Sequence, residues 1–203
     1  MTGVNDDLDD GDIAYTAVIG AATSTDTLYS GMNPNDVALT NTDDDTAGIT
    51  VSAPSATKTT EAGGKVTFTV KLNSEPTANV TIPISSSDTT EGTVSPATLT
   101  FTAANWNVAQ TVTVTGVSDL LADGNVAYSI VTAATVSDDP LYSGLAVADV
   151  AVTNQNVAGA PGITVTPTSG LVTTESGGTA TFTVVLQSQP TANVTIGLTS
   201  SDV

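Results

Sequence analysis

The sequence predicts an all-β protein built from tandem antiparallel β-sandwiches of about seven strands each. One long stretch occurs twice, as TTEAGGKVTFTVKLNSEPTANVTIPISSSD at residues 59–88 and as TTESGGTATFTVVLQSQPTANVTIGLTSSD at residues 173–202, a period of 114 residues. A unit of that length is the size of one domain. Val, Ile and Thr dominate, apolar and polar residues alternate, and no stretch has an apolar stripe at helical spacing.

The period divides the chain into three parts. Residues 1–47 match the end of a repeat, because TGV, a tyrosine and LYSG recur 113 residues later. Residues 48–161 form one complete repeat, which opens with GITV, and residues 162–203 begin the next copy with the same four letters. One extra residue in the second linker restores the period to 114.

Each predicted strand of the complete repeat follows from its alternation. After the opening segment, Val66, Phe68, Val70 and Leu72 point to one face while lysines and threonines point to the other. The later segments repeat this pattern between Gly, Pro, Asn, Asp and Ser clusters, so that the predicted strands lie at 49–53, 65–72, 80–84, 99–101, 112–114, 126–130 and 150–152. Seven short strands in this length indicate an Ig-like sandwich, with the aromatic residues as core and loop anchors.

If successive strands alternate in direction, the loops separate into two poles. The turn at Glu61, the turn holding Asp88 and Glu91, the turn 119–123 and the exit after Val152 share one pole. The loops 74–76, 103–108 and 137–144 share the other. The acidic residues that recur between copies gather at the exit pole, where the next repeat begins.

The charge balance excludes several functions. Twenty-one acidic residues face three lysines, with no histidine, for a net charge of −18. Such a surface repels nucleic acid and anionic membranes but suits hard cations; simple solubility is the alternative explanation. Without cysteine there is no disulfide or thiol chemistry. No apolar run is long enough for a membrane helix, and the first residues lack signal-peptide features, so an export signal is expected outside these residues.

The acidic pole resembles the Calx-β domains and related Ig-like repeats of large bacterial surface proteins. The features in common are a Glu before a Gly pair, an Asp after the third strand, an acidic turn after TVTVTGVSD, and an Asp-rich exit before AGI. The resemblance covers the whole chain through its repeats. It implies Ca²⁺ between these loops, with the ligands Glu61, Asp88, Asp119 and Asp123 in the complete repeat, Asp6, Asp7, Asp10, Asp43, Asp44 and Asp45 in the first, and Glu175 and Asp202 in the third.

The complete repeat departs from this pattern. Its exit reads Asn154-Gln155-Asn156 where three aspartates are expected from the first copy, and neutral amides are weaker ligands, so fewer ions are expected there. An EF-hand at Asp7-Leu-Asp-Asp-Gly11 is excluded, because Leu8 and Ala17 occupy positions that need acidic ligands. An acidic turn explains that segment better.

The predicted function is structural: an extracellular, cell-surface stalk, spacer or fibre segment of an adhesin-like protein, stiffened by Ca²⁺ between repeats. The expected partners are neighbouring repeats of the same chain, with self-association into a fibre as a further option, and neither nucleic acid nor membrane insertion. The alternative is a carbohydrate- or receptor-binding adhesion module that uses Tyr29 and Tyr142 as exposed loop residues. An enzyme is not expected, because no His or Cys can act as base or nucleophile.

Overall fold

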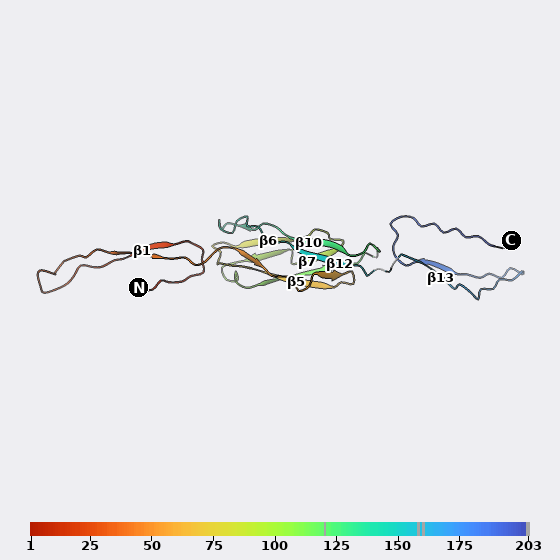
Figure 1. Cartoon of the computed structure of the whole chain (residues 1–203), viewed down its shortest axis with the longest axis horizontal. Helices are drawn as coiled ribbons and strands as arrows, with labels where there is room; N and C mark the ends of the chain where they lie inside the picture. Colours follow the sequence, from red (N-terminus) through yellow and green to blue (C-terminus); the bar gives the residue numbers. More distant parts are fainter. Residues whose placement is uncertain (120, 158, 160, 202–203) are drawn as a thin grey trace.

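A computed structural model describes residues 1–119, 121–157, 159 and 161–201. These residues form strands and loops without a helix, and therefore include no helix that could cross a membrane. Three parts follow one another in a row (Figure 1). The first is a hairpin of β1 (Ile13–Ala17) and β2 (Val37–Asn41), the second holds β3 to β12, and the third pairs β13 (Ile163–Thr166) with β14 (Thr183–Leu186).

The middle part is a sandwich of two sheets, as predicted. One sheet has the order β3 (Ile49–Val51), β5 (Lys65–Leu72), β9 (Gln110–Gly116), β7 (Gly92–Ser95). The other has the order β11 (Val136–Ser137), β6 (Val80–Ser86), β10 (Val126–Thr132), β12 (Val150–Gln155), β4 (Lys58–Thr60), and β8 (Thr98–Phe101) also pairs with β6. Apolar side chains from both sheets fill the space between them.

The alternation in the sequence correctly identifies the core. Every second side chain of β5 is buried, from Val66 to Leu72, and β6, β9, β10 and β12 follow the same rule. Burial of these side chains, each worth about 1.5–3 kcal/mol, is the main source of stability of the sandwich. All seven predicted strands are present.

The predicted antiparallel sandwich is confirmed, with one parallel pair among the described strands. β4 runs parallel to β12, with Thr153 opposite Lys58. The opening segment causes this arrangement, because it pairs antiparallel with β5 through β3 and then crosses to the other sheet as β4. β4, β7 and β11 were not predicted because they are only two to four residues long and offer little alternation. The crossing strand gives the sandwich an Ig-like architecture.

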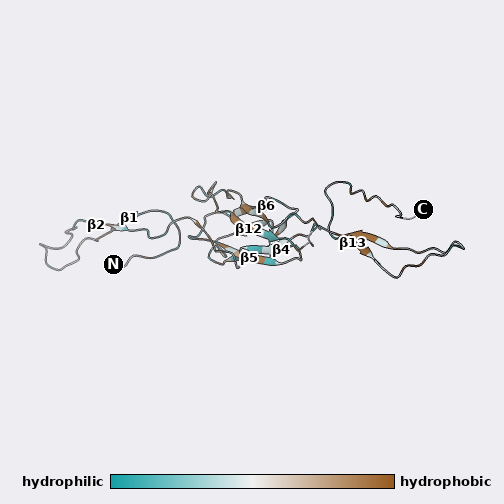
Figure 2. Ribbon diagram, turned by 45° about the vertical axis from the view of Figure 1, so that its right-hand side comes forward, coloured by the Kyte–Doolittle hydropathy of each residue, from teal (hydrophilic) through white to brown (hydrophobic). Residues whose placement is uncertain are grey.

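The two flanking parts have apolar residues at the positions that are buried in the complete repeat, but the residues described there form no second sheet to cover them. Phe68 is 1% exposed in the complete repeat, whereas its equivalent Phe182 is 45% exposed. The hydropathy colouring in Figure 2 marks β13 as mostly hydrophobic. One sheet layer cannot cover both of its faces, so these side chains remain in contact with solvent.

Candidate metal centre at the acidic pole

The loops that the sequence assigns to the exit pole do lie together. Asn154 Nδ2 donates to Glu91 Oε2 over 3.2 Å, and the backbone N–H of Val157 donates to Glu61 Oε2 over 2.8 Å. These contacts join the exit strand to the turns that follow β4 and β6. The predicted arrangement of loops at this pole is therefore confirmed.

Three carboxylates converge at this pole. One oxygen from each of Glu61, Asp119 and Asp123 lies within 4.8 Å of the others. Two oxygens that bind one Ca²⁺ at about 2.3–2.6 Å are at most about 5 Å apart, so this spacing fits a shared ion. The three residues range from buried Glu61 through half-buried Asp119 to exposed Asp123, which leaves room for water as further ligands.

Backbone contacts hold Glu61 and Asp119 in place. The N–H of Glu61 donates to the carbonyl of Gln155 over 3.1 Å, which fixes the start of the turn against β12. Asp119 Oδ1 accepts from the N–H of Leu121 over 2.9 Å, an Asx-type turn. Asp123 is followed by Gly124, whose φ of 87° favours glycine.

Glu91 is a buried carboxylate beside this cluster that the sequence analysis placed at the pole but not among the ligands. Burial raises the pKa of Glu91, the hydrogen bond from Asn154 opposes this, and the negative charges of Asp123, Asp119 and Asp88 raise it further. A cation between these groups would relieve their mutual repulsion. The sequence signal that could have identified Glu91 is its position three residues after Asp88, in the same turn.

Asn154 is the buried centre of the polar contacts beneath the cluster. Its Oδ1 accepts from Thr59 Oγ1 over 3.1 Å, and its Nδ2 also donates to the carbonyl of Val117 over 2.9 Å. Thr59 in turn bonds to the hydroxyl of Tyr128 over 3.1 Å. The amide thus has a structural role in joining β4, β10 and β12.

The geometry corrects the register of the exit strand. Asn41 Nδ2 donates to the carbonyl of Val4 over 2.9 Å, the same contact that Asn154 makes with Val117, so Asn41 is the equivalent of Asn154. Asp43 is then the equivalent of Asn156, and their N–H groups accordingly donate to Asp12 Oδ1 and Asn125 Oδ1. Asp44 has Val157 as its equivalent. The 113-residue offset of the other matches would have revealed this register.

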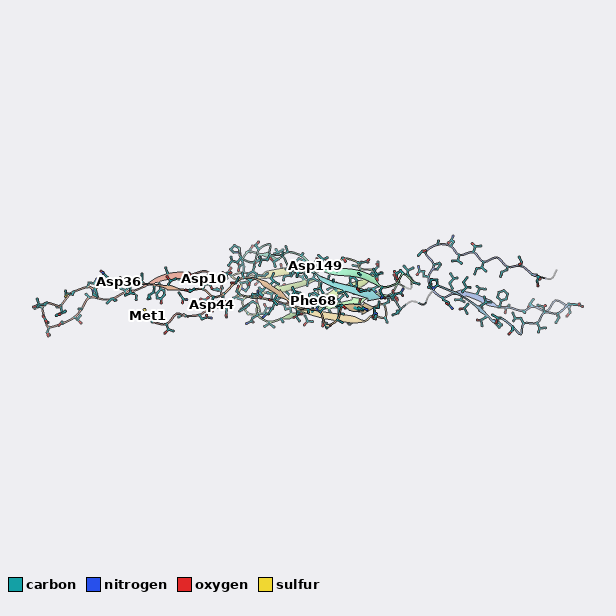
Figure 3. All side chains as sticks on the ribbon, viewed as in Figure 1. Met1, Asp10, Asp36, Asp44, Phe68 and Asp149 are labelled. Atoms are coloured by element: carbon teal, nitrogen blue, oxygen red, sulfur yellow. The ribbon has the colours of Figure 1, made fainter. Side chains whose placement is uncertain are left out.

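The first part presents a richer acidic pole. A cavity of about 370 Å³ is lined there by Asp6, Asp10, Asp43, Asp44 and Asp45, and Figure 3 shows Asp10 and Asp44 at the end nearest the sandwich. Gly11 N–H donates to Asp43 Oδ2 over 2.6 Å.

The surroundings shift the pKa values of two of these carboxyls in opposite directions. Hydrogen bonds from the N–H groups of Asp45 and Gly11 hold the pKa of Asp43 below its usual value. Desolvation, followed by the charges of Asp44, Asp43, Asp7 and Asp6, raises the pKa of Asp45. Asp7 is exposed and belongs to the same turn.

Asp88 and Glu175, two further predicted ligands, are not among the three clustered carboxylates. Asp88 Oδ1 accepts from the hydroxyl and the N–H of Thr90, over 2.6 and 3.0 Å, and these bonds lower its pKa. Glu175 is exposed in the third part, which contains only the beginning of a repeat. Asp202 lies outside the described residues.

At the opposite pole, the predicted exposure of Tyr142 is wrong. Tyr142, expected to be exposed, is 1% exposed, and its hydroxyl donates to the carbonyl of Ser74 over 2.8 Å. The equivalent Tyr29 is 62% exposed because the first part has no second sheet to cover it. In the complete repeat this tyrosine therefore anchors a loop and offers no binding surface.

No family model and no curated protein matches this chain. Among solved structures, SSP-19, an MSP-domain protein like family member in Caenorhabditis elegans, is similar over 52% of this chain and 99% of its own, with 13% identity and a TM-score of 0.35. Domains 4 and 5 of the S-layer protein SbsC are similar over 64% of this chain and 69% of their own, with 19% identity and a TM-score of 0.33. With TM-scores this low, these similarities carry no conclusion about function.

Proposed function

We propose that this chain is a structural segment of an extracellular repeat protein, a stalk or spacer whose repeat boundaries are stiffened by Ca²⁺. The observation that supports the proposal most strongly is the position of the carboxylate cluster. Glu61, Asp119 and Asp123 converge at the end of the complete repeat from which the chain leaves toward the next copy.

The chemistry of the cluster favours a hard cation such as calcium over softer metals. Every ligand offered is an oxygen, and the chain contains no His or Cys for softer metals. Without an ion, the three close carboxylates repel one another, and Asp123 is held partly by the weak contact between Asn156 Nδ2 and Asp123 Oδ1 at 3.5 Å. An ion reverses this repulsion, because it attracts both turns and holds them against the exit strand.

Calorimetric unfolding tests the calcium part of the proposal. Because Ca²⁺ binds the folded site, the free energy of unfolding of the complete repeat is expected to rise by about 2.7 kcal/mol at about a hundredfold excess over the dissociation constant, relative to chelator. Glu61→Gln and Asp119→Asn each remove one ligand charge and are expected to abolish most of the rise.

The matched control is Asp138→Asn, which removes an exposed carboxylate from the opposite pole and is expected to preserve the rise. Identical melting curves with calcium and with chelator for the unsubstituted chain would contradict the calcium proposal. So would an equal loss of the rise in Asp138→Asn.

A further inference from the structure

The two boundaries between repeats bring equivalent segments of the chain together through backbone contacts. At the first boundary, the N–H of Glu75 donates to the carbonyl of Asp7 over 2.7 Å. At the second boundary, Leu121 forms a parallel β-bridge with Gln189, the equivalent of Glu75 one period later. Leu121 belongs to the turn that is equivalent to the turn of Asp7. At both boundaries, the acidic turn of one repeat therefore meets the same loop of the next.

The loop that meets the acidic turn, here called the receiving loop, comprises residues 73–77 and, one period later, residues 187–191. It is anchored by the same backbone hydrogen bond in both copies. The N–H of Asn73 donates to the carbonyl of Gly48 over 2.9 Å, and the N–H of Gln187 donates to the carbonyl of Gly162 over 2.9 Å. These bonds tie the loop to the first residues after the linker. The linker and the receiving loop thus form one surface opposite the acidic turn.

Two buried side chains of the complete repeat hold the backbone of the receiving loop in place. The hydroxyl of Tyr142 accepts from the N–H of Ser74 over 3.1 Å, and Asp139 Oδ2 accepts from the N–H of Thr77 over 2.8 Å. Both Tyr142 and Asp139 are buried. Ser74 and Thr77 flank Glu75, so its N–H is held at a fixed place in the loop.

The contact does not depend on how acidic the turn is. Turn 6–12 contains five aspartates, whereas the equivalent turn 119–125 contains two. The first boundary has one additional side-chain bond, from the N–H of Ala47 to Asp9 Oδ2 over 2.7 Å, and the equivalent of Asp9 is Ala122. Backbone groups, which are common to both boundaries, therefore make the recurring part of the contact.

We infer that the acidic turn and the receiving loop form a repeat-to-repeat joint, a docking surface whose partner is the next copy of the same repeat. The joint fixes the angle between successive repeats through backbone hydrogen bonds. The acidic turn that forms one side of the joint is also the turn on which calcium acts. The inference deepens the proposed function and rests on it only for the role of the array as a stalk. The joint itself needs no ion.

Distance measurements across the first boundary test the joint. The chain has no cysteine, so Val18→Cys and Thr111→Cys, both at exposed positions, accept one spin label each. Glu75→Pro removes the N–H donor, whereas the matched Glu75→Ala keeps it. In chelator, Glu75→Pro is expected to broaden the distribution of label distances by about twofold or more, because the donor of the joint is lost. Glu75→Ala is expected to leave the width unchanged.

A second pair of variants separates the backbone contact from the side-chain bond of the first boundary. Asp9→Ala removes the acceptor for Ala47 and leaves the backbone contact in place, so it is expected to broaden the distribution less than Glu75→Pro does; Asp9→Asn keeps an oxygen at the same place and is expected to leave the width unchanged. An unchanged width in Glu75→Pro would overturn the inference, and so would equal broadening in Glu75→Ala or a broadening in Asp9→Ala that exceeds that in Glu75→Pro. Because the measurement is made in chelator, a failure of the joint is distinguishable from a failure of calcium binding.

Discussion

Replacing Tyr142 with alanine is expected to lower the free energy of unfolding of the complete repeat by about 3–5 kcal/mol, the usual cost of deleting a large buried aromatic side chain. The substitution leaves a cavity in the core of the sandwich. It also removes the hydroxyl that contacts the N–H, the Oγ and the carbonyl of Ser74. Denaturant unfolding followed by tryptophan fluorescence measures the change, since Trp106 packs against the same core.

Tyr29→Ala is the matched control, because Tyr29 occupies the equivalent position in the first part and is 62% exposed. It is expected to change the free energy of unfolding of the complete repeat by less than about 0.5 kcal/mol. Equal effects of the two substitutions would contradict the assignment of Tyr142 as an internal anchor. Such a result would also reopen the adhesion alternative, for which this loop was the candidate surface.

Replacing Asn154 with alanine is expected to cost about 3 kcal/mol, because several buried groups would lose their partner together. Thr59 Oγ1, Glu91 and the carbonyl of Val117 all bond to this amide. Thermal unfolding in chelator measures the effect without a contribution from calcium.

The matched control for Asn154 is Asn41→Ala, which breaks the equivalent bond to Val4 in the first part. It is expected to leave the unfolding of the complete repeat unchanged. A cost below about 1 kcal/mol for Asn154→Ala would mean that water replaces the amide easily, and the pole would then be less rigid than these contacts indicate.

The fold was predictable because its information is local and repeated. Alternation along segments such as Val66 to Leu72 identifies buried positions, and the period identifies equivalent ones. The crossing of β4 to the second sheet was not predictable, since Lys58 to Thr60 carry no apolar alternation. Their place is set by pairing with β12, a contact between residues distant in the sequence.

The acidic pole was predictable as a location but less so as a list of ligands. Strand direction alone brings Glu61 and the 119–123 turn to one end. Which carboxylates converge depends on side-chain bonds within each turn: Thr90 holds the Asp88 carboxylate, whereas Glu91 is buried toward Asn154. Such competition between local and long-range partners leaves no mark in the sequence pattern.

The central claim, that calcium stiffens the boundaries of this array, is tested most directly by distances across the second boundary. Spin labels at Thr111→Cys and Val172→Cys, both at exposed positions, report on the complete repeat and the part that follows it. We expect calcium to narrow the distance distribution relative to chelator, and Glu61→Gln to remove that narrowing. Equal widths in calcium and in chelator, in a chain that binds calcium by calorimetry, would contradict the claim.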